Sequence, residues 1–520
     1  MSETPAPPSP NRSISQEQRL RPTLSTRKIV IMVVAAAAPL AALVGTVPLA
    51  FAIGDGPGVP AMFLFAGVTL LCFSVGYAAM SRRIVNAGGF YTYVSSGLGR
   101  PPAVGAGLVA VLSYNTATVG MVGTFAYFTE LVGDQAGLHL RWEWWAALSI
   151  AAMAVLGYRQ IDFSARVLQI LLVGEIGILL LLDIAVIVRH GGGAMPATSF
   201  APHTVFGAGA GVTVMFAFAS FIGFESAALY GEESRNPKRS VPLATYISVI
   251  TITVFYAFTS WIAVGAIGPS HLRKVAGKQL GDMFFRLSDD YLDKSVTSVM
   301  AILLCTSLFA GVLALHNAAN RYMYVLGRER VLPGGLDAIH PKYNAPHRAS
   351  LVQTTLTVVL VAVFAIAGLD PYVNLATSML GIGTLGIVVL QAAAALSVVG
   401  FFRNRPDRHW WRTGLAPLLG FVGLTVSVVL LVENFSVLTG TDNPVVHALP
   451  WLLVAATVGG VLYGLWIRSA RPERYAGLAR TEVRDTEPHV ETTTVLRPAP
   501  AVVPPPSPAA EGPSARTGNQ

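Results

Sequence analysis

The chain has 520 residues, of which 53% are hydrophobic and only 12% are charged, and its formal net charge is +8. Its mean hydropathy of +0.57 is far above what a soluble domain needs to fill its core. These values exclude an ordinary soluble protein and predict a protein of the membrane.

About twelve stretches of roughly 17 to 30 mostly apolar residues recur along the chain, and a helix needs about 20 residues to cross a bilayer. Such long runs lack the alternation of a barrel strand, so the predicted fold class is an all-α membrane protein. In chain order the expected spans are 29–53, 60–80, 103–132, 142–158, 163–188, 205–230, 243–267, 296–324, 351–368, 372–402, 415–435 and 445–467.

The lysines and arginines are distributed unevenly between these spans. With the amino terminus inside, about 26 of them fall in or beside inner segments and about seven in outer ones, as the positive-inside rule requires. The net charge is thus a topology signal, and membrane lipid rather than nucleic acid is the expected partner. The high Ala, Val, Gly and Pro content suggests a bacterium, so we expect a cytoplasmic membrane protein with both termini in the cytoplasm.

The two ends of the chain and its two cysteines carry no expected chemistry. Residues 1–28 are polar and Pro/Ser-rich without a signal peptide, and 468–520 are Pro/Ala-rich; both are expected to be disordered cytoplasmic tails. Cys72 and Cys305 fall within expected spans, where a thiol behaves as a small apolar group. No disulfide, metal site or cofactor is expected.

The first and sixth spans contain residues that interrupt helices. The first has Pro39, Gly45 and Pro48, and the sixth has four glycines between 207 and 223. Interrupted spans at corresponding positions of two halves favour an inverted repeat with a binding site at the membrane midplane. Unwound backbone offers N–H groups to a carboxylate and carbonyls to an ammonium group, which suits a zwitterion. The alternative is that the small residues only allow close helix packing.

The sixth span also carries an acid. Glu225 lies roughly five residues before the expected inner end of the helix, and an ionisable residue inside the membrane is a functional candidate by default. The alternative is that it ties helix ends together by hydrogen bonds. After it, Asn236-Pro237 is expected to break the helix and Pro242 to open the next one.

Three stretches resemble the amino acid-polyamine-organocation superfamily of transporters. FIGFESAALYGEESRNPKRSVPLA resembles its sixth helix and following loop, GYAAMSRRIVNAGGFYTYVSSGLGR the loop after its second helix, and NRYMYVLGRERVLPGGLDAIHPKYNAP the loop after its eighth. The resemblance covers about residues 29–467. It implies a ten-helix core at 29–402, built as a five-plus-five inverted repeat with broken first and sixth helices, and two additional helices at 403–467.

The resemblance also implies an amino acid substrate held against the two breaks, here at 38–45 and 217–223. Its carboxylate would bind backbone amides of the first break, and its amino group would bind carbonyls of both. The expected binding residues are Ala38, Pro39, Leu40, Ala41, Leu43, Val44, Gly45, Asn115, Ala217, Phe218, Ala219, Ser220, Phe221 and Gly223. Two departures from the family pattern are APLAALVGTVP in place of a Gly-rich run, and Ala219 where some members carry a bulky gating ring. Since Pro39 has no N–H, the carboxylate must use amides such as those of Leu40, Ala41 and Leu43.

The coupling residue implied by the resemblance lies in the fifth span. Sodium-independent members often carry a lysine there, and this chain has Glu175 in LLVGEIGILLLLD. A carboxylate at this position either takes up a proton, ligates a cation together with Thr306 or Ser307, or is only hydrogen-bonded to an adjacent helix. The leading hypothesis is proton-coupled amino acid symport, with Glu225 and Glu175 as coupling residues and Na⁺ as the other candidate ion.

Several other functions compete with this hypothesis. An amino acid exchanger and an importer of a polyamine or other small organic cation fit the same fold. A channel or a substrate-sensing receptor fits less well. An enzyme is not expected, because the spans lack clustered acids, histidines or a nucleophile with its base. The sequence makes no prediction of the oligomeric state.

Overall fold

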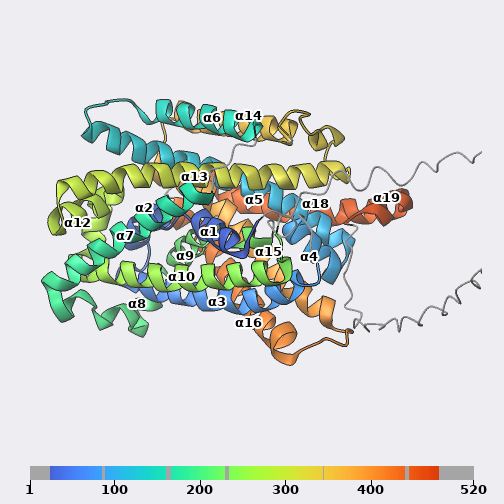
Figure 1. Cartoon of the computed structure of the whole chain (residues 1–520), viewed down its shortest axis with the longest axis horizontal. Coiled ribbons are helices and arrows are strands. Elements are labelled where there is room, and N and C mark those ends of the chain that lie inside the picture. Colours follow the sequence, from blue (N-terminus) through green and yellow to red (C-terminus); the bar gives the residue numbers. More distant parts are fainter. Residues whose placement is uncertain are drawn as a thin grey trace, which may run out of the picture. The chain divides into compact units, whose positions relative to one another are not determined.

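The computed structural model of the chain describes residues 24–84, 88–159, 165–228, 234–343, 345–439 and 444–479. These residues form helices joined by turns (Figure 1), and an isolated β-bridge joins Leu24 to Ser234. They all belong to one unit, Met1–Val483, and a second unit, Arg484–Gln520, lies outside them.

The helices follow one another in this order: α1 (Thr26–Ala36), α2 (Pro39–Ile53), α3 (Val59–Ser81), α4 (Gly89–Leu98), α5 (Arg100–Gln135), α6 (Trp142–Tyr158), α7 (Ala165–His190), α8 (Pro202–Val205), α9 (Ala210–Ser220), α10 (Pro237–Ile267), α11 (Leu272–Gln279), α12 (Met283–Tyr291), α13 (Lys294–Arg328), α14 (His347–Ile366), α15 (Thr377–Phe402), α16 (Ala416–Glu433), α17 (Phe435–Thr439), α18 (Pro444–Ala470) and α19 (Pro472–Gly477). The shorter helical turns are η1 (Gly56–Gly58), η2 (Gly191–Ala194), η3 (Ala197–Phe200), η4 (Phe224–Ala228), η5 (Leu280–Asp282), η6 (Gly334–Asp337) and the π-helical turns η7 (Pro371–Ala376) and η8 (Trp410–Leu415).

Eleven helical stretches of the described residues are long and apolar enough to cross a membrane. The prediction of an all-helical membrane protein is therefore confirmed. The one expected span that is not among the eleven is the fourth, 142–158. It does form a helix, α6, but with 17 residues it is the shortest of the expected spans.

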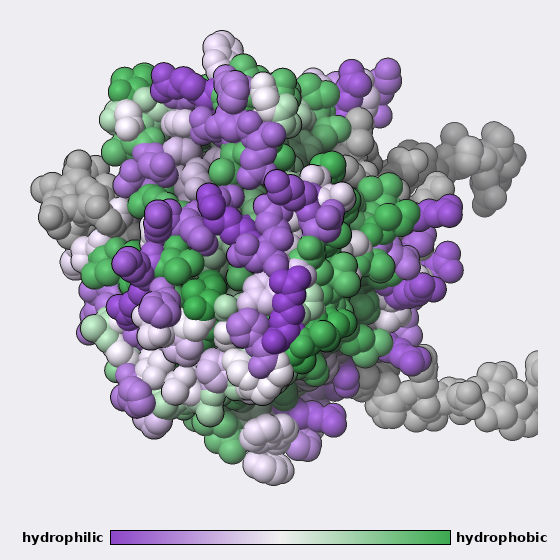
Figure 2. Space-filling view, turned by 90° about the vertical axis from the view of Figure 1, so that its left-hand side faces the viewer, coloured by the Kyte–Doolittle hydropathy of each residue, from purple (hydrophilic) through white to green (hydrophobic). Residues whose placement is uncertain are grey.

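The surface of the long helices is apolar where it faces outward. Ile170, Val173 and Ile184 of α7 are exposed, as are Val363 of α14 and Trp451 of α18. Exposed apolar side chains on this scale indicate contact with lipid rather than water. Figure 2 views the end that carries α11 and α12, and hydrophilic residues extend across this end.

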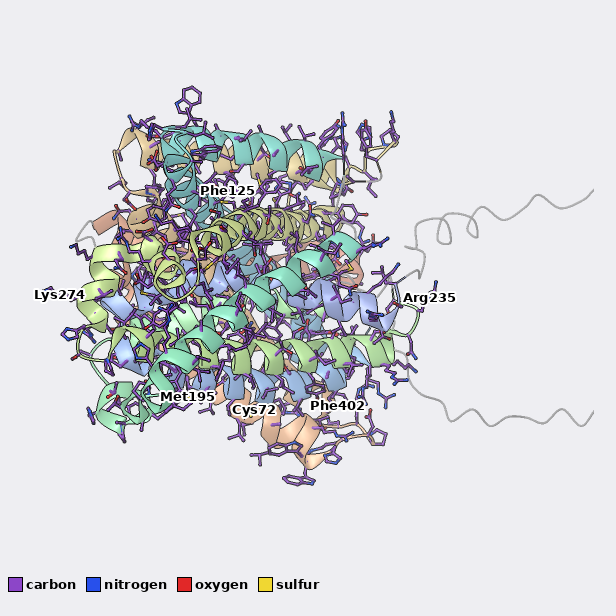
Figure 3. The ribbon with its side chains drawn as sticks, turned by 60° about the vertical axis from the view of Figure 1, so that its left-hand side comes forward. Cys72, Phe125, Met195, Arg235, Lys274 and Phe402 are labelled. Atoms are coloured by element: carbon purple, nitrogen blue, oxygen red, sulfur yellow. The ribbon has the colours of Figure 1, made fainter. Side chains whose placement is uncertain are left out.

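The two ends of the helices carry different segments of the chain. In Figure 3, Arg235 lies at one end of the molecule and Lys274 at the other, with Phe402 toward the Arg235 end and Met195 toward the Lys274 end. The sequence predicted this separation, because Arg235 was expected on the inner side and Lys274 in an outer loop.

The helices around the centre pack in two groups. In the first group, α10 packs on α1 and α3, and α9 packs on α2 and α3. In the second group, α5 packs on α6 and α13, and α14 packs on α6, side by side in Figure 1, and on α13. The helices α15 and α18 also pack against α5.

Two short interruptions lie within the first group. After α1 ends, Ala38 adopts a left-handed conformation with φ of 44°, and α2 begins with Pro39 at its first position. After α9 ends at Ser220, the chain turns through Gly223, with φ of 116°, into η4. The interruptions are shorter than the ranges 38–45 and 217–223, because proline is well tolerated at the first helical position and lets α2 start at once.

The expected boundary at Pro242 is wrong. Helix α10 begins at Pro237, directly after Asn236, and Pro242 lies inside it. Proline at the first helical position removes an N–H that has no intrahelical acceptor, so Pro237 starts the helix without loss. Pro242 then removes one further hydrogen bond, which a long packed helix accommodates.

Two helices form the last part of the chain that the structure describes. Helix α18 continues to Ala470, and α19 follows. The Arg100 guanidinium donates to the carbonyls of Ala476 and Leu478, at 3.2 and 3.1 Å, and its charge lies over the Tyr475 ring. These contacts hold the segment after α18 against the start of α5.

The crossing of α5 and α18 depends on the absence of side chains at two glycines. A Cβ atom on Gly460 would lie 2.5 Å from the Cα of Gly105, whereas a Cβ on its neighbour Gly459 would meet nothing within 4 Å. We therefore expect Gly460→Ala to lower the free energy of unfolding by about 1–3 kcal/mol through overpacking.

Gly459→Ala is the matched control, because alanine favours the helix and finds open space there. Thermal unfolding of the purified protein in detergent should show a lower midpoint for Gly460→Ala only. Equal midpoints for both variants would contradict this account of the crossing.

The turn between α2 and η1 is held by Asp55. Its Oδ1 accepts a hydrogen bond from the Gly209 amide at 3.0 Å, and its own amide donates to the Thr213 hydroxyl at 2.7 Å. Burial raises the pKa of this carboxyl to about 6, although the Gly209 amide and the charge of Arg273 oppose the shift. The ordinary value is 3.8, so the folded protein binds more protons than the unfolded chain between about pH 4 and 6.

The sign of this linkage gives a prediction. The contribution of Asp55 to stability is greatest below about pH 4 and falls as the pH rises through 6, by about 1 kcal/mol once solvent screening is allowed for. Asp55→Asn cannot titrate, so its melting temperature should fall less between pH 5 and 7.5 than that of the parent.

Asp293→Asn serves as the control. The Ser295 amide lowers the pKa of the exposed Asp293 below its usual value, so this group stays ionised over the whole range. A parent and an Asp55→Asn variant with the same pH dependence of melting would contradict the prediction.

Candidate functional site

A cavity of about 190 Å³ lies between the two groups of helices. The first group contributes residues of α1, α2 and the turn after α9, and the second contributes residues of α5 and α13. Both interruptions therefore face the same space.

The cavity separates the expected binding residues into two sets. Those that line it are Ala38, Ala41, Gly45, Ala219, Ser220 and Gly223. Those that lie outside the lining are Pro39, Leu40, Leu43, Val44, Asn115, Ala217, Phe218 and Phe221. The division has a simple cause, because residues 39–53 and 210–220 are helical and present only one face of each helix to the cavity.

Glu225 lies at the cavity wall with both carboxylate oxygens bonded. Its Oε1 accepts a hydrogen bond from the Tyr114 hydroxyl at 2.8 Å, and its Oε2 accepts one from the Gly223 amide at 3.0 Å. The Tyr77 hydroxyl donates to its backbone carbonyl at 3.1 Å. The side chain thus supports the turn after α9 and also places a carboxylate beside the cavity.

Tyr114 is itself fixed in place. Its ring stacks on that of Tyr322 of α13 with centroids 5.2 Å apart, and the Tyr322 hydroxyl accepts a hydrogen bond from the Phe90 amide at 3.3 Å. The donor to Glu225 is therefore held by α5 and α13 of the second group, while Glu225 belongs to the first.

The side chain of Glu175, a residue of α7, reaches the start of α2 and is not part of the cavity lining. Its Oε2 accepts a hydrogen bond from the Leu40 amide at 3.2 Å, and the residue is 5% exposed. Buried Ser307 of α13 is beside the same carboxylate, whereas Thr306 is exposed and its hydroxyl bonds carbonyls of its own helix. Of the two expected cation partners, only Ser307 is near Glu175.

Two hydrogen bonds connect the middle of α2 with its neighbours. The hydroxyls of Thr46 and Ser220 are 2.9 Å apart, and the Tyr372 hydroxyl donates to the Gly45 carbonyl at 3.0 Å. The first bond joins α2 to the end of α9, and the second joins it to η7, which precedes α15. Thr46 and Ser220 both line the cavity.

The contribution of α13 to the cavity was not predicted from the sequence. Asn320 and Arg321 line the cavity, and the Asn320 Oδ1 is buried without a hydrogen-bond partner among the described residues. The available signal was the spacing of Asn317, Asn320 and Arg321, which puts polar side chains on one face of an apolar helix. Asn115 has a local role instead, because its Nδ2 donates to the Val111 carbonyl of the same helix at 2.7 Å.

No group of three His, Cys, Asp or Glu side chains suited to a metal ion occurs in the part of the chain that the structure describes. His316 of α13 has partners in α14, since its ring nitrogens lie against the Gln353 amide and, at 3.0 Å, the Ser350 hydroxyl. This ring therefore joins two helices.

Long apolar helices around a cavity with a buried carboxylate at its wall are typical of a membrane transporter. Residues 24–462 match the model of the amino acid permease family, and the chain belongs to this family. It is accordingly an integral membrane transporter and not an enzyme.

Several bacterial proteins are similar to this chain over most of their length. The branched-chain amino acid permease BcaP of Bacillus subtilis is 26% identical over 443 residues, which cover 80% of this chain and 87% of the relative. The low-affinity putrescine importer PlaP of Escherichia coli K12 is 25% identical over 453 residues, or 81% and 90% of the two chains. The methylthioribose transporter of Bacillus subtilis is 25% identical over 364 residues, or 66% and 74%.

The pair formed by Tyr114 and Glu225 gives a prediction about stability. Tyr114→Phe removes one of the two donors to a buried carboxylate, so the free energy of unfolding should fall by about 1.5–3 kcal/mol. Tyr324→Phe is the control, because the Tyr324 hydroxyl has no hydrogen-bond partner among the described residues. Thermal unfolding in detergent distinguishes the two variants, and an unchanged midpoint for Tyr114→Phe would rule out a stabilising role for this bond.

Proposed function

We propose that this protein is a proton-coupled amino acid symporter that works by alternating access. The observation that carries the proposal is the cavity between the two groups of helices, with the start of α2 on one side and the Glu225 carboxylate on the other. The first offers the positive end of a helix to a carboxylate, and the second offers a negative charge to an ammonium group. An amino acid carries both groups.

The size and polarity of the wall favour a small or apolar side chain. Much of the lining consists of Ala, Met and Leu, including Ala41, Met121 and Leu308. The relative BcaP is named as a branched-chain amino acid permease, which agrees with such a pocket.

A polyamine or other organic cation is the second candidate substrate. The relative PlaP is named as a putrescine importer, and Glu225 at the cavity wall would attract a cation as well as a zwitterion. A third relative is named as a methylthioribose transporter, so the substrates named for these relatives differ in kind. We favour the amino acid because the start of α2 also faces the cavity through Ala38 and Ala41.

The proposed architecture is an inverted repeat of α1–α7 and α9–α15, with α16 and α18 as the two additional helices. The interruptions after α1 and after α9 then correspond to the broken first and sixth helices. The group of α1, α2, α3, α9 and α10 would rock against that of α5, α6, α13 and α14, with the contacts of α13 on α1 and α2 between them.

We place the protein in a bacterial cytoplasmic membrane with both termini in the cytoplasm. The bacterial sources of the relatives and the excess of lysine and arginine in the expected inner segments support this. We expect no cofactor, and H⁺ rather than Na⁺ as the coupling ion, with Glu225 and Glu175 as the two buried acids available for it.

The test is uptake of a labelled amino acid mixture into proteoliposomes, with and without an inward proton gradient. The parent should accumulate amino acids only with the gradient. Glu225→Gln should lower this accumulation at least about tenfold, because Glu225 is the one acidic side chain among the described residues that line the cavity. Glu433→Gln, which changes an exposed acid at the end of α16, should behave as the parent.

Each other outcome points to a different function. Accumulation that requires preloaded vesicles would indicate an exchanger. Accumulation that depends on a sodium gradient would show that the coupling ion is Na⁺ and not H⁺. Saturable uptake of putrescine without uptake of any amino acid would identify a polyamine importer and overturn the proposed substrate.

A further inference from the structure

The start of α2 presents two adjacent backbone amides with different surroundings. The Leu40 amide donates to Glu175, whereas the Ala41 amide has no acceptor among the described residues, and Ala41 lines the cavity. The N–H groups of a first helical turn all point toward the helix start. A carboxylate that reaches the Ala41 amide from the cavity therefore arrives next to the carboxylate of Glu175.

A separate observation indicates that the cavity takes a ligand. Asn320 lines it with a side chain that is 3% exposed, and its Oδ1 has no hydrogen-bond partner among the described residues. A buried acceptor without a protein partner is met by a water or by a donor of a bound molecule, and this one lies at the cavity. A substrate ammonium group between Asn320 and Glu225 would supply this donor. The substrate carboxylate would then bind the amides at the start of α2.

We propose that Glu175 and the carboxylate of the transported amino acid share the amino-terminal end of α2, and that Glu175 takes up the co-transported proton when the substrate binds. This inference rests on the proposed function and adds the means of coupling. It also makes the carboxylate the feature of the substrate that drives proton uptake.

The physical reason is a shortage of positive charge at the start of α2. Arg321, the cation among the described lining residues, follows Asn320 on α13 and lies well along that helix from Ser307, which is beside Glu175. A helix start supplies the equivalent of about half an elementary charge, which matches one carboxylate but not two. Two carboxylates in one buried site are not both ionised, so one of them holds a proton. An α-carboxyl group is the stronger acid of the two, and therefore Glu175 is the group that becomes protonated.

The groups that face Glu175 offer no other positive charge. Among the described residues they are the Leu40 amide from α2, the Ser307 hydroxyl from α13 and the Tyr256 phenol from α10. The charged residues of α1, Arg27 and Lys28, lie at its exposed start. Helix α12 contacts α7 at the far end, near Arg189, whose guanidinium donates to the Asp290 carbonyl.

The proton balance is simple. Glu175 accepts a proton from the aqueous phase that the cavity faces, as the substrate enters as a zwitterion. On the opposite side the substrate leaves, Glu175 releases the proton to that phase, and its carboxylate again accepts the Leu40 hydrogen bond. One zwitterion and one proton cross in each cycle, so each cycle moves one positive charge.

The experiment compares L-leucine with 3-methylbutylamine, its decarboxylated analogue, in equilibrium binding to the full-length protein between pH 5.5 and 7.5. If uptake identifies another amino acid, that amino acid and its own amine replace the pair. The apparent dissociation constant of the amino acid should rise about tenfold per pH unit toward the upper end, as uptake of one proton requires. The amine brings no carboxylate, so its binding should not change with pH.

Variants then assign the proton to one residue. Glu175→Gln should abolish the pH dependence and bind the amino acid about tenfold more tightly at pH 7.5, because a neutral amide competes less strongly for the helix start. Glu225→Gln should weaken binding but keep the pH dependence. Asp183→Asn is the matched control, since Asp183 is a buried acid of α7 that bonds Thr259 and does not line the cavity.

The outcomes separate the inference from the function on which it rests. If no amino acid binds, the proposed function and this inference both fail. If an amino acid binds with no pH dependence, or keeps it in Glu175→Gln, the inference fails and the function stands. If Glu175→Gln does not fold, the comparison of amino acid and amine in the parent still tests whether the carboxylate drives proton uptake, and loss of the pH dependence in Glu225→Gln would overturn the assignment to Glu175. Equal pH dependence for both ligands would overturn the inference.

Discussion

Backbone groups at membrane depth must find partners inside the protein, and this constraint shapes the centre of the structure. The interruption between α1 and α2 frees several such groups. The Tyr256 hydroxyl of α10 donates to the Ala37 carbonyl at 3.2 Å, and Glu175 of α7 accepts from the Leu40 amide. The interruption can therefore exist only where α7 and α10 approach it with these side chains. At the second interruption, Glu225 and Tyr77 meet the same need for the Gly223 amide and the Glu225 carbonyl.

The glycines that suggested broken helices prove to be of two kinds. Gly223 has the positive φ that a sharp turn requires. Gly209 and Gly211 instead permit close contact, because added Cβ atoms would lie 2.3 Å from the Gly54 carbonyl carbon and 2.2 Å from the Asn434 amide nitrogen. Close helix packing therefore explains the glycines at the start of α9, and a sharp turn explains Gly223 after its end. Composition alone could not separate them, since both kinds are single glycines in an apolar helix.

The sequence predicted the fold class well because the bilayer imposes length and hydropathy directly on each span. It predicted that the segments around Ala38 and Gly223 share one site, and the structure brings them to one cavity. It did not predict which side chains face that cavity. Leu43 and Val44 were included as part of an unwound stretch, but α2 is helical there and turns them away. Asn320 was missed because its importance depends on an unmet hydrogen bond, which only the packed structure reveals.

The two buried acids of the site differ in how firmly they are held, and this difference bears on their roles. Glu225 has a donor on each oxygen, one from Tyr114 of the opposite group and one from its own turn. The two donors oppose the cost of burying its charge and hold the side chain in place, so this carboxylate suits a fixed binding partner for a cation. Glu175 has one backbone donor, in a helix start that also borders the cavity. With this one backbone donor and the Ser307 hydroxyl beside it, Glu175 depends for part of its stabilisation on a helix start that a second anion would share. This difference supports the proposed roles, in which Glu175 carries the proton and Glu225 receives the substrate ammonium group.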